Sequence, residues 1–478
     1  MTTLQASGNK NRLEEINIRN VREHLIGLDR KVPLLDGSEV TYVNFDNAAS
    51  TPTFDFIYDK VGDYLEFYSN VHRGTGFKSI LSSWVYEQGR EKVAEFINAD
   101  LDQNVIIFTK NSTEALNKLA RRYPFKTGDV VLTTLMEHHS NELPWRNRAY
   151  YDHIGLNPDG SLNLDDLRQK LDYYHGKVKL VAVTGASNVT GYINPIHEIA
   201  KMVHQAGAEL LMDSAQIAPH RPINMRGNGD DDHIDYLVLS AHKMYAPFGV
   251  GVLVGNQKIF ETGDPTDVGG GMVDIVTLED AYWTDLPEKE EAGTPDIVGV
   301  VALAQSIAMI NKIGWENIIA HETELTEYML EKLNRIEGVI VYGDRDPKNS
   351  ANRLGVVPFN LEGLPHALLA AILNFEGGIG VRNGCFCAHT YVKYLLDVPD
   401  NEAKKLEDDI KNRDRSNLPG TVRASFGIYN SKEEIDRLEE VLKKIDATGY
   451  AGKYELNKVK GEFFPKNLDI NLESYFSL

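Results

Sequence analysis

The chain has 478 residues, of which 42% are hydrophobic and 25% are charged, as in an ordinary globular protein. Its formal net charge of -20 argues against nucleic acid or an anionic membrane as a partner, because both attract clustered lysine and arginine. One simple core cannot accommodate this length, so we expect two or more packed units.

Two cysteines, Cys385 and Cys387, stand one residue apart. A disulfide across so short a loop would be strained, and a zinc site would need more ligands, so we expect neither a disulfide-stapled secreted protein nor a metal centre. Residues 1–20 lack the apolar segment of a signal peptide, and no apolar run is long enough to cross a bilayer. These patterns predict a cytoplasmic protein that does not bind membranes.

The chain divides into four expected parts. Residues 1–40 form an N-terminal segment that we expect to pack on a small domain. Residues 41–297 alternate short apolar runs with amphipathic stretches, which indicates a large α/β domain. The expected strands are Val105–Phe108, Val130–Thr134, Leu180–Thr184, Glu209–Met212, Tyr236–Leu239 and Val250–Val254. The expected helices include Ser82–Ile97, Ser112–Arg122 and Pro195–Gln205. Continuous apolar strands suit a sheet covered on both faces, and ligands collect at the carboxyl ends of such strands.

Residues 298–446 predict the smaller C-terminal α/β domain. A long helical stretch over Val298–Arg335 comes first, and the expected strands that follow are Val339–Tyr342, Arg353–Phe359 and Thr421–Ser425. The charged run Asn401–Arg415 predicts a solvated insertion. The extension 447–478 carries aromatic residues among polar ones, so we expect it to pack on the body or on a partner subunit.

Two candidate functional residues follow apolar strands of the large domain. Lys243 comes shortly after Tyr236–Leu239, and lysine forms Schiff bases with carbonyl cofactors when burial or a nearby charge lowers its pKa. A buried lysine is, however, more often merely paired. Asp213 follows Glu209–Met212, where a carboxylate could pair with a protonated pyridine nitrogen or simply cap the next helix.

Further polar clusters fall at similar positions. Ser112 and Thr113 begin an expected helix, whose N–H groups suit a phosphate, although an ordinary helix cap explains the same residues. His138 and His139 also follow a strand. A third ligand at metal-binding spacing is not apparent, so one imidazole stacked on an aromatic cofactor ring is the favoured interpretation.

The segment from Arg382 to His389 combines an arginine with both cysteines. An arginine offers a bidentate fork to a substrate carboxylate. A cysteine on this glycine-containing loop becomes a nucleophile if its pKa falls below about 8.5, although a cysteine is more often a small buried hydrophobe.

Taken together, these segments resemble the class V aminotransferases among fold-type I pyridoxal-phosphate (PLP) enzymes, and most closely the group II cysteine desulfurases and selenocysteine lyases. The resemblance runs in order from about Tyr42 to Asp446. The matching segments are Phe45-Asp46-Asn47-Ala48-Ala49-Ser50, Val71-His72-Arg73-Gly74, Met136-Glu137-His138-His139, Ser187-Asn188-Val189, Asp213-Ser214-Ala215-Gln216, Ser240-Ala241-His242-Lys243, Glu291-Ala292-Gly293-Thr294-Pro295 and Arg423-Ala424-Ser425.

The resemblance implies a large domain with a mostly parallel seven-stranded sheet and a smaller C-terminal α/β domain. It also implies that Lys243 holds PLP as a Schiff base and moves the substrate α-proton. Asp213 would pair with the pyridinium nitrogen, Gln216 would bind the phenolic oxygen, and His139 would stack on the ring and transfer protons. The residues implied to hold the phosphate are Ser112, Thr113, Ser240 and His242.

Substrate and partner contacts follow from the same resemblance. Asn188 and Arg382 would bind the carboxylate of a small amino acid. His72, Arg73 and the loop Gly269-Gly270-Gly271 would reach the site of a neighbouring subunit, which implies a homodimer with shared active sites.

The resemblance also implies that Cys387 takes sulfur from L-cysteine, giving L-alanine and a persulfide that a sulfur-acceptor protein could receive. Cys385 departs from the desulfurase pattern, and Gly-Cys-Phe-Cys is similar to molybdenum-cofactor sulfurases. One alternative is an aminotransferase, epimerase or C–S lyase of the same superfamily, with Cys387 structural. A cofactor-binding scaffold without activity is disfavoured by the presence of Lys243, Asp213 and His139 together.

Overall fold

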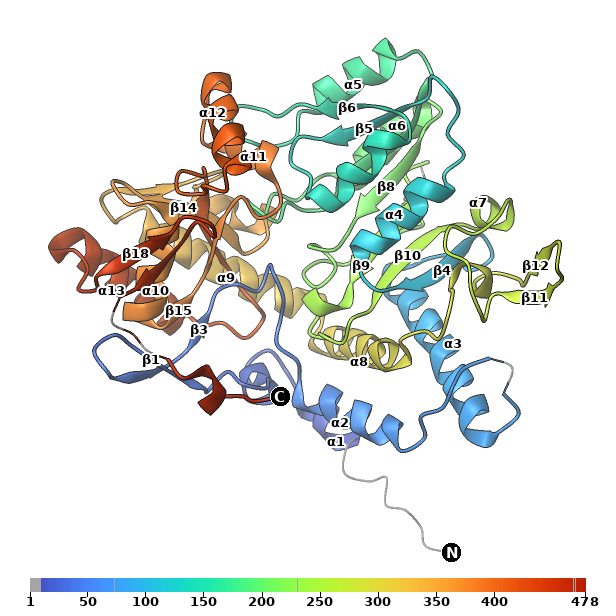
Figure 1. Ribbon diagram of the computed structural model, residues 1–478, viewed down its shortest axis with the longest axis horizontal. Coiled ribbons are helices and arrows are strands. Elements are labelled where there is room, and N and C mark those ends of the chain that lie inside the picture. Colours follow the sequence, from blue (N-terminus) through green and yellow to red (C-terminus); the bar gives the residue numbers. More distant parts are fainter. Residues whose placement is uncertain (1–9, 73, 230, 467, 469) are drawn as a thin grey trace, which may run out of the picture.

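The computed structural model describes residues 10–72, 74–229, 231–466, 468 and 470–478. Figure 1 shows two α/β bodies joined by the helices α8 (Ile297–Ile313) and α9 (Trp315–Leu333). The larger body contains the central stretch of the chain, and the smaller body contains most of the C-terminal third. Residues 1–9, the start of the expected N-terminal segment, lie outside the described part.

The larger body is built on a seven-stranded sheet in the order β4-β10-β9-β8-β7-β5-β6. β10 is antiparallel to both of its neighbours, and the other pairings are parallel. The expected mostly parallel sheet is therefore confirmed. Its strands are β4 (Asn104–Thr109), β5 (Val130–Thr134), β6 (Tyr150–Ile154), β7 (Val178–Thr184), β8 (Glu209–Asp213), β9 (Tyr236–Ser240) and β10 (Gly251–Asn256).

Alternate residues of these strands enter two different cores. Along β4, Val105 and Ile107 belong to one hydrophobic cluster, while Ile106 and Phe108 belong to the other. Successive side chains of a strand point to opposite faces, so the sheet is buried on both sides. The helices of this body are α2 (Asp55–Leu65), α3 (Phe77–Ile97), α4 (Ser112–Arg122), α5 (Leu164–Tyr173), α6 (Ile196–Gln205) and α7 (Gln257–Glu261).

The expected long helix over Val298–Arg335 is two helices. They meet at Gly314, whose φ of 85° lies in the left-handed region that favours glycine, and their axes bend by 80°. α8 belongs to the larger core, whereas α9 enters the smaller core from Leu325 onward. Of the helices in the described ranges, none is alone both long and apolar enough to cross a membrane, and α8 and α9 satisfy that test only as a bent pair.

The smaller body has a four-stranded antiparallel sheet in the order β13-β14-β17-β16. Its strands are β13 (Val339–Val341), β14 (Val356–Leu361), β16 (Arg382–Gly384) and β17 (Thr421–Ser425), and its main helices are α10 (His366–Gly377) and α13 (Lys432–Thr448). A separate parallel pair joins β3 (Val43–Asn44) to β15 (Ile379–Gly380). The segment that precedes the large sheet therefore pairs with a strand of the small domain.

The N-terminal segment packs on both bodies, which differs from the expectation that it packs on the small domain. α1 (Lys10–Glu15) precedes Ile16, and the buried side chains of Ile16, Val21 and Leu25 belong to the larger core. The following hairpin of β1 (Lys31–Pro33) and β2 (Glu39–Thr41) adjoins the small domain, where the Leu35 N–H donates to the Phe375 carbonyl.

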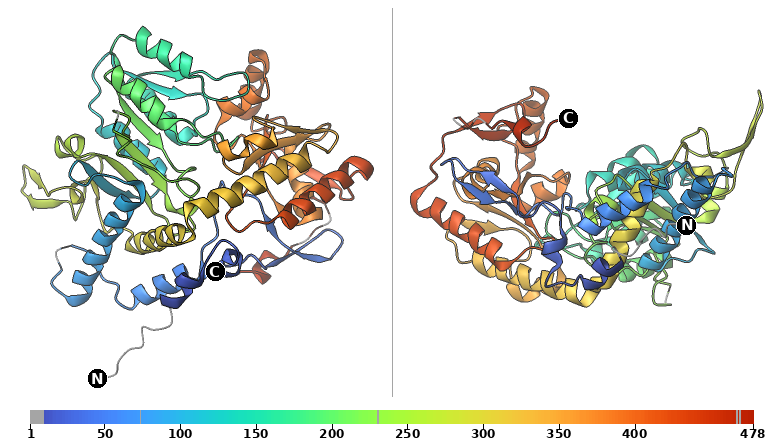
Figure 2. Two further views of the ribbon diagram at one scale, coloured as in Figure 1. Left: turned by 180° about the vertical axis from the view of Figure 1, so that it is seen from behind. Right: turned by 90° about the horizontal axis from the view of Figure 1, so that it is seen from below.

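The charged insertion contains a helix, and the hairpin of the C-terminal extension packs on α10 of the small domain. α11 (His389–Leu395) and α12 (Asp400–Lys411) follow the cysteine segment, and the extension forms a hairpin of β18 (Tyr454–Asn457) and β19 (Glu462–Pro465). The Tyr454 hydroxyl donates to Glu376 of α10, 3.0 Å away. Figure 2 shows the hairpin lying over the small domain, on the side away from the large sheet.

A buried ion pair joins α3 to the segment that leads into α8. The Arg90 guanidinium makes two hydrogen bonds to the Glu291 carboxylate, at 2.8 and 2.7 Å. Glu291 also accepts from the Tyr86 hydroxyl and from the Phe108 N–H of β4. Both charged side chains are almost fully buried. Removing one partner of such a pair leaves an uncompensated charge in the core.

We predict that Glu291→Ala destabilises the protein by about 3–5 kcal/mol, because Arg90 is left buried without its carboxylate. Thermal unfolding followed by circular dichroism should show a melting temperature lower by several degrees. Glu87→Ala is the matched control, since Glu87 pairs with the same guanidinium from an exposed position and surface pairs contribute about 0–1 kcal/mol. Equal effects of the two substitutions would contradict this prediction.

Candidate active site

A cavity of about 460 Å³ lies where the carboxyl ends of β7, β8 and β9 meet the small domain. Parallel strands present their following loops at one edge of the sheet, and this explains why polar segments far apart in sequence converge here. The residues that line it are Ala48, Ala49, Ser50, Asn111, Ser112, Thr113, His138, Ser140, Thr184, Ala186, Asn188, Asp213, Ala215, Gln216, Ser240, His242, Lys243, Arg382, Phe386, Cys387 and Arg423.

Lys243 lies in a single helical turn, Ala241–Lys243, directly after β9. Its Nζ donates to the Gln216 Oε1 at 3.2 Å. Burial lowers the pKa of Lys243 to about 8; the neighbouring Asp213 opposes this shift and Arg423 reinforces it. A substantial fraction of this amine is therefore unprotonated near neutral pH, which is the form that attacks a carbonyl carbon.

Asp213 is the last residue of β8 and is buried. Its Oδ1 accepts from the Ala215 N–H at 3.0 Å. Burial raises the pKa of Asp213, while the Ala215 hydrogen bond and the charge of Lys243 lower it. A buried carboxylate on a cavity wall favours a positively charged or N–H-bearing partner, and a protonated pyridine ring supplies both properties.

The start of α4 forms the opposite polar end of the cavity. The Ser112 N–H donates to the Ser240 Oγ at 2.9 Å, and the Ser240 hydroxyl donates to the Ser112 Oγ at 3.0 Å. The Thr113 hydroxyl lies 2.7 Å from the Ser140 hydroxyl. Hydroxyls and N–H groups at the N-terminus of an eleven-residue helix suit a phosphate. Burial lowers the pKa of His242, which faces the same cavity, to about 4, so its ring is neutral.

The cavity therefore fits PLP by the chemistry of its walls. It has a lysine with a lowered pKa for a carbonyl group, a buried carboxylate for a ring nitrogen, and a helix start for a phosphate. Its volume also lies in the range of small-molecule sites, which is about 300–1,000 Å³.

Of the two adjacent histidines, His138 lines the cavity together with His242, whereas His139, expected to stack on a cofactor ring, is not among the described residues that line it. The His139 ring instead stacks on His389, with 4.7 Å between ring centroids, and their nitrogens lie 3.0 Å apart. The two side chains diverge because their backbone turns into a short 3-10 helix, His139–Asn141. The His138 Nδ1 accepts from the Ser140 N–H, so its Nε2 carries the proton.

Arg423, in the middle of β17, is a site residue that sequence reasoning did not single out. Its buried guanidinium donates to the Asn188 carbonyl at 2.8 Å and to the Asp46 Oδ1 at 3.0 Å, and it lies 4.7 Å from the centre of the Phe386 ring. The expected carboxylate-binding Arg382 also lines the cavity, but its side chain is 57% exposed. The segment Arg423-Ala424-Ser425, one of those that carry the family resemblance, was the signal that could have identified Arg423.

The two cysteines face different surroundings. Cys387 is exposed and lines the catalytic cavity. Cys385 is buried, its Sγ donates to the Pro419 carbonyl at 3.0 Å, and burial raises the pKa of its thiol to about 11. The thiolate is the reactive form, so Cys385 is the less reactive of the pair.

The Cys387 loop is fixed by its backbone. Phe386 and Cys387 have φ values of 51° and 55°, in the left-handed region that costs a residue with a side chain free energy. The His139 N–H donates to the Cys387 carbonyl at 2.7 Å, and the Asn188 side-chain amide donates to the Phe386 carbonyl at 2.9 Å. These two bonds hold the loop against the large domain. Asn188, expected to bind substrate, also lines the cavity, and this bond uses only one of its two amide N–H groups.

His72 lies away from Lys243, in a second pocket of about 460 Å³ that it shares with Gly270 and Gly271. His72 and the glycine loop therefore lie together, and their reach into the site of a neighbouring subunit stays a prediction. Arg73, the other residue of that prediction, lies outside the described residues.

One histidine cluster lies at the opposite end of the sheet, between the last turn of α6 and the segment before β9. His204 donates from Nδ1 to the Asp231 carbonyl and from Nε2 to the Asp235 carboxylate, and its ring stacks on His233. Hydrogen bonds and the charges of Asp235 and Asp231 raise the pKa of His204 to about 9, against the effect of burial. Ion pairs between His204 and the two aspartates thus account for the charges of this cluster.

Known proteins match most of this chain. The family model for class-V aminotransferases matches residues 43–438. A probable cysteine desulfurase from Halalkalibacterium halodurans is 36% identical over 438 residues, which cover 90% of this chain and 98% of that protein. A cysteine desulfurase from Haloferax volcanii is 34% identical over 432 residues, covering 88% of this chain and 94% of that protein.

Solved structures agree in fold. The apo cysteine desulfurase from Thermococcus onnurineus NA1 has a TM-score of 0.74 and 35% identity, covering 84% of this chain and 94% of that one. The cysteine desulfurase CsdA from Escherichia coli has a TM-score of 0.72 and 26% identity, covering 90% of this chain and 98% of that one.

We predict that Lys243 in the cofactor-free protein reacts with a small aldehyde with a midpoint near pH 8, because its pKa is lowered and the unprotonated amine accumulates as pH rises through that value. Borohydride reduction and mass spectrometry at each pH would measure the midpoint. Asp213→Asn should move it lower, since Asp213 favours the charged amine. A midpoint near 10, as for the exposed lysines, would contradict the prediction.

Proposed function

The chain belongs to the class V aminotransferase family, and from this premise we propose that it is a PLP-dependent cysteine desulfurase. It removes sulfur from L-cysteine, releases L-alanine and carries the sulfur as a persulfide on Cys387. The observation that carries this proposal is the exposed Cys387 thiol on the wall of the cavity that also contains Lys243. An amino acid held over Lys243 would have its side chain close to that thiol.

Several side chains of the cavity would hold the cofactor. Lys243 would bind its carbonyl carbon, Asp213 its ring nitrogen and Gln216 its phenolic oxygen. Ser112, Thr113, Ser240 and His242 would hold its phosphate, and His138 would lie against its ring. When bound, PLP withdraws electrons from the substrate Cα and so weakens the bonds around that carbon.

Arg423 and Arg382 orient the substrate by its carboxylate. Arg423 is buried and fixed by Asn188 and Asp46, so it provides a rigid positive charge at the inner wall. Arg382 is exposed and lies beside Asp46, 3.7 Å away, at the outer side. Charge-assisted bonds from two arginines favour an α-carboxylate over a neutral group.

Lys243 moves the α-proton. Its pKa of about 8 lies near physiological pH, which lets the amine both accept and return a proton. The Cys387 thiolate then attacks the substrate sulfur. The Cβ–S bond breaks, an S–S bond forms on Cys387, and Cβ gains a proton, so that alanine forms without any external oxidant.

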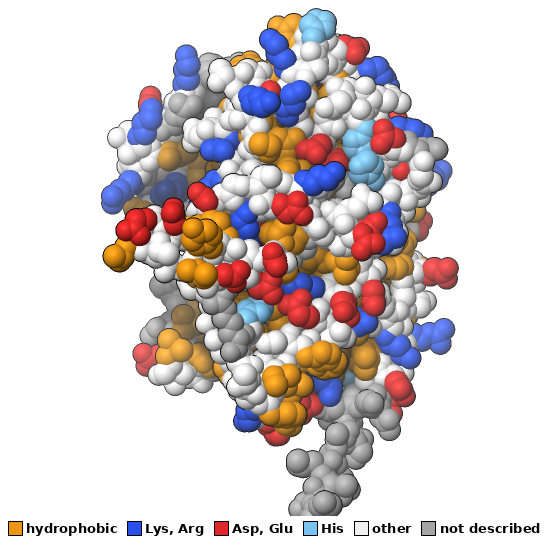
Figure 3. All heavy atoms as spheres, turned by 90° about the vertical axis from the view of Figure 1, so that its right-hand side faces the viewer, with side chains coloured by type: hydrophobic (Ala, Val, Ile, Leu, Met, Phe, Trp, Pro, Cys, Tyr) orange, Lys and Arg blue, Asp and Glu red, His pale blue; other side chains and the backbone are white. Residues whose placement is uncertain are grey.

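We also propose a homodimer. α3 presents Phe77, Ile80 and Trp84 as exposed apolar side chains, and their spacing places them on one stripe of the helix. The nearby hairpin of β11 (Val273–Val276) and β12 (Ala281–Trp283) projects from the body (Figure 1) and exposes Ile275 and Val276. On this side of the molecule hydrophobic side chains gather in patches (Figure 3). Exposed apolar clusters mark association surfaces.

Cys387→Ser should abolish sulfide and alanine release from L-cysteine, because the attacking thiol is lost, while Cys385→Ser should retain most of the activity. Alanine and sulfide would be measured in the presence of a reductant. Retention of activity in Cys387→Ser would favour another class V reaction with Cys387 in a structural role. Loss of activity in Cys385→Ser, with the fold intact, would make Cys385 the sulfur carrier.

Trp84→Glu should convert the dimer into monomers and lower activity at least about tenfold, because a charge buried in an interface without a partner costs more than 1.4 kcal/mol. Light scattering after gel filtration gives the mass. Tyr173→Glu is the matched control, since Tyr173 is also an exposed aromatic, 73% accessible against 59% for Trp84. A dimeric Trp84→Glu variant would place the interface elsewhere.

A further inference from the structure

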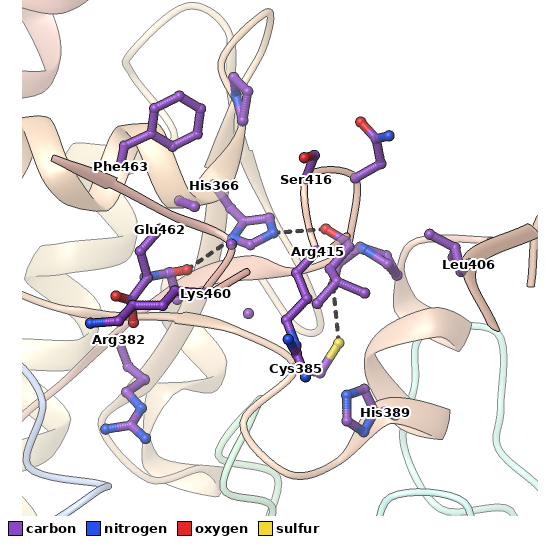
Figure 4. A pocket seen from close by; sticks show the side chains of 18 of the residues that line it. His366, Arg382, Cys385, His389, Leu406, Arg415, Ser416, Lys460, Glu462 and Phe463 are labelled. Carbon is purple, nitrogen blue, oxygen red and sulfur yellow. Dashed lines mark hydrogen bonds between the residues drawn. The ribbon is translucent and has the colours of Figure 1, made fainter. Parts of the chain in front are cut away.

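Another cavity, of about 860 Å³ and distinct from the His72 pocket, adjoins the catalytic one. Its walls come from three places: the segment from Arg382 to His389, the insertion with α12, and the β18–β19 hairpin of the C-terminal extension. Figure 4 shows the side chains of these segments around one open space. The hairpin lies beyond residues 43–438, which the family model matches. We call this cavity the outer pocket.

The insertion and the extension are fastened together at the outer pocket. The Arg415 N–H donates to the Lys458 carbonyl at 2.8 Å, and its guanidinium donates to the Val459 carbonyl at 2.6 Å. Gly461 has a φ of 73°, and a Cβ there would lie 2.9 Å from the Arg415 carbonyl oxygen. The hairpin thus fits closely against the insertion, and the two segments together form one wall of the pocket.

The outer pocket carries a surplus of positive charge in a chain whose net charge is -20. Four cationic side chains line it: Arg382, Lys393, Arg415 and Lys460. Two acidic residues, Asp46 and Glu462, line it as well, and Asp46 already pairs with Arg382 and with the buried Arg423. A concave region of one sign concentrates ligands of the opposite sign. Leu406, Ile410 and Phe463 add apolar surface.

The outer pocket leads to the catalytic cavity. Arg382 lines both spaces, and Asp46 joins it to Arg423 of the catalytic wall. Cys385 lines the outer pocket and Cys387 the catalytic cavity, two positions apart on one loop. A molecule in the outer pocket therefore lies next to the loop that carries Cys387.

We propose that the outer pocket binds the thiol that takes sulfur from Cys387, and that this acceptor thiol carries carboxylate groups. The proposal rests on the proposed desulfurase function. The cationic surplus selects the carboxylates, and the volume accommodates a small organic acid or a short acidic peptide segment. Cys385 is not the acceptor, because its thiol is hydrogen-bonded to Pro419 and buried.

The transfer step balances without an oxidant. The acceptor thiolate attacks the outer sulfur of the Cys387 persulfide and forms a new S–S bond. The bond between that sulfur and Cys387 breaks, and its electron pair leaves with Cys387 as a thiolate. The acceptor departs as a persulfide, and Cys387 is ready for the next cysteine.

The test compares thiols of different charge in alanine production over many turnovers, with the rate in L-cysteine alone subtracted. The probes are mercaptosuccinate, 2-mercaptoethanol and cysteamine, and each thiol is compared between wild type and variant so that intrinsic reactivity cancels. Lys460→Glu should lower kcat/KM for mercaptosuccinate by up to about fivefold, the upper end of what one exposed ion pair contributes, and leave 2-mercaptoethanol unchanged.

Lys458→Glu is the matched control. Lys458 is on the same hairpin, is exposed and pairs with Asp414, but it does not line the outer pocket. It changes the net charge by the same amount as Lys460→Glu. Equal losses in the two variants, or no dependence on thiol charge, would overturn the proposal.

A short peptide with cysteine between glutamates forms a second arm. A larger Lys460 dependence for the peptide than for mercaptosuccinate assigns the pocket to an acidic segment of an acceptor protein, and the reverse assigns it to a small thiol. Both results support the pocket.

Alanine released in a single turnover without added thiol separates this proposal from the function on which it rests. If about one alanine is released per chain and Lys460→Glu changes the rate with none of the thiols, the outer-pocket proposal alone is overturned. Absence of that alanine would overturn both.

Discussion

The catalytic cavity depends on the attachment of one strained loop to the large domain. Phe386 and Cys387 hold left-handed backbone conformations, which persist only where surrounding contacts fix them. Those contacts are the His139 N–H on the Cys387 carbonyl and the Asn188 amide on the Phe386 carbonyl. Both donors belong to the large domain and both acceptors to the small one. The same two bonds therefore close the domain interface and aim the thiol at the cavity.

Charge inside the cavity is balanced across this interface. Lys243 and Asp213 come from the large domain, whereas Arg423 comes from the small one and pairs with Asp46. Burial is the main cause of the lowered pKa of Lys243; Asp213 opposes it, and Arg423 of the small domain adds to it.

The sequence predicts well what burial alone determines. The strands Val130–Thr134 and Thr421–Ser425 are placed to the residue, and every residue of both strands is buried. β6 was missed among the individual strands because its residues are half-exposed at the sheet edge. The choice between His138 and His139 depended on a single backbone turn that no periodicity reports. Arg423 lies in a strand that is buried throughout, Thr421–Ser425, and the sequence does not show which of its polar side chains faces a cavity. The bend at Gly314 separates helices whose apolar pattern is unbroken.

The parts of the chain that the sequence described least are those that surround the cavity entrance. The insertion is strongly charged and the extension lacks regular periodicity, so each read separately predicts only a surface segment. Only the contact between the two segments shows that they form a pocket. Arg415 binds the backbone of Lys458 and Val459, so the two surface segments become one wall. That wall places positive charge beside the Cys387 loop of an acidic protein. A field of this kind would repel the cations and favour the anions that approach the loop, and selection among acceptors would then occur before any bond to sulfur forms.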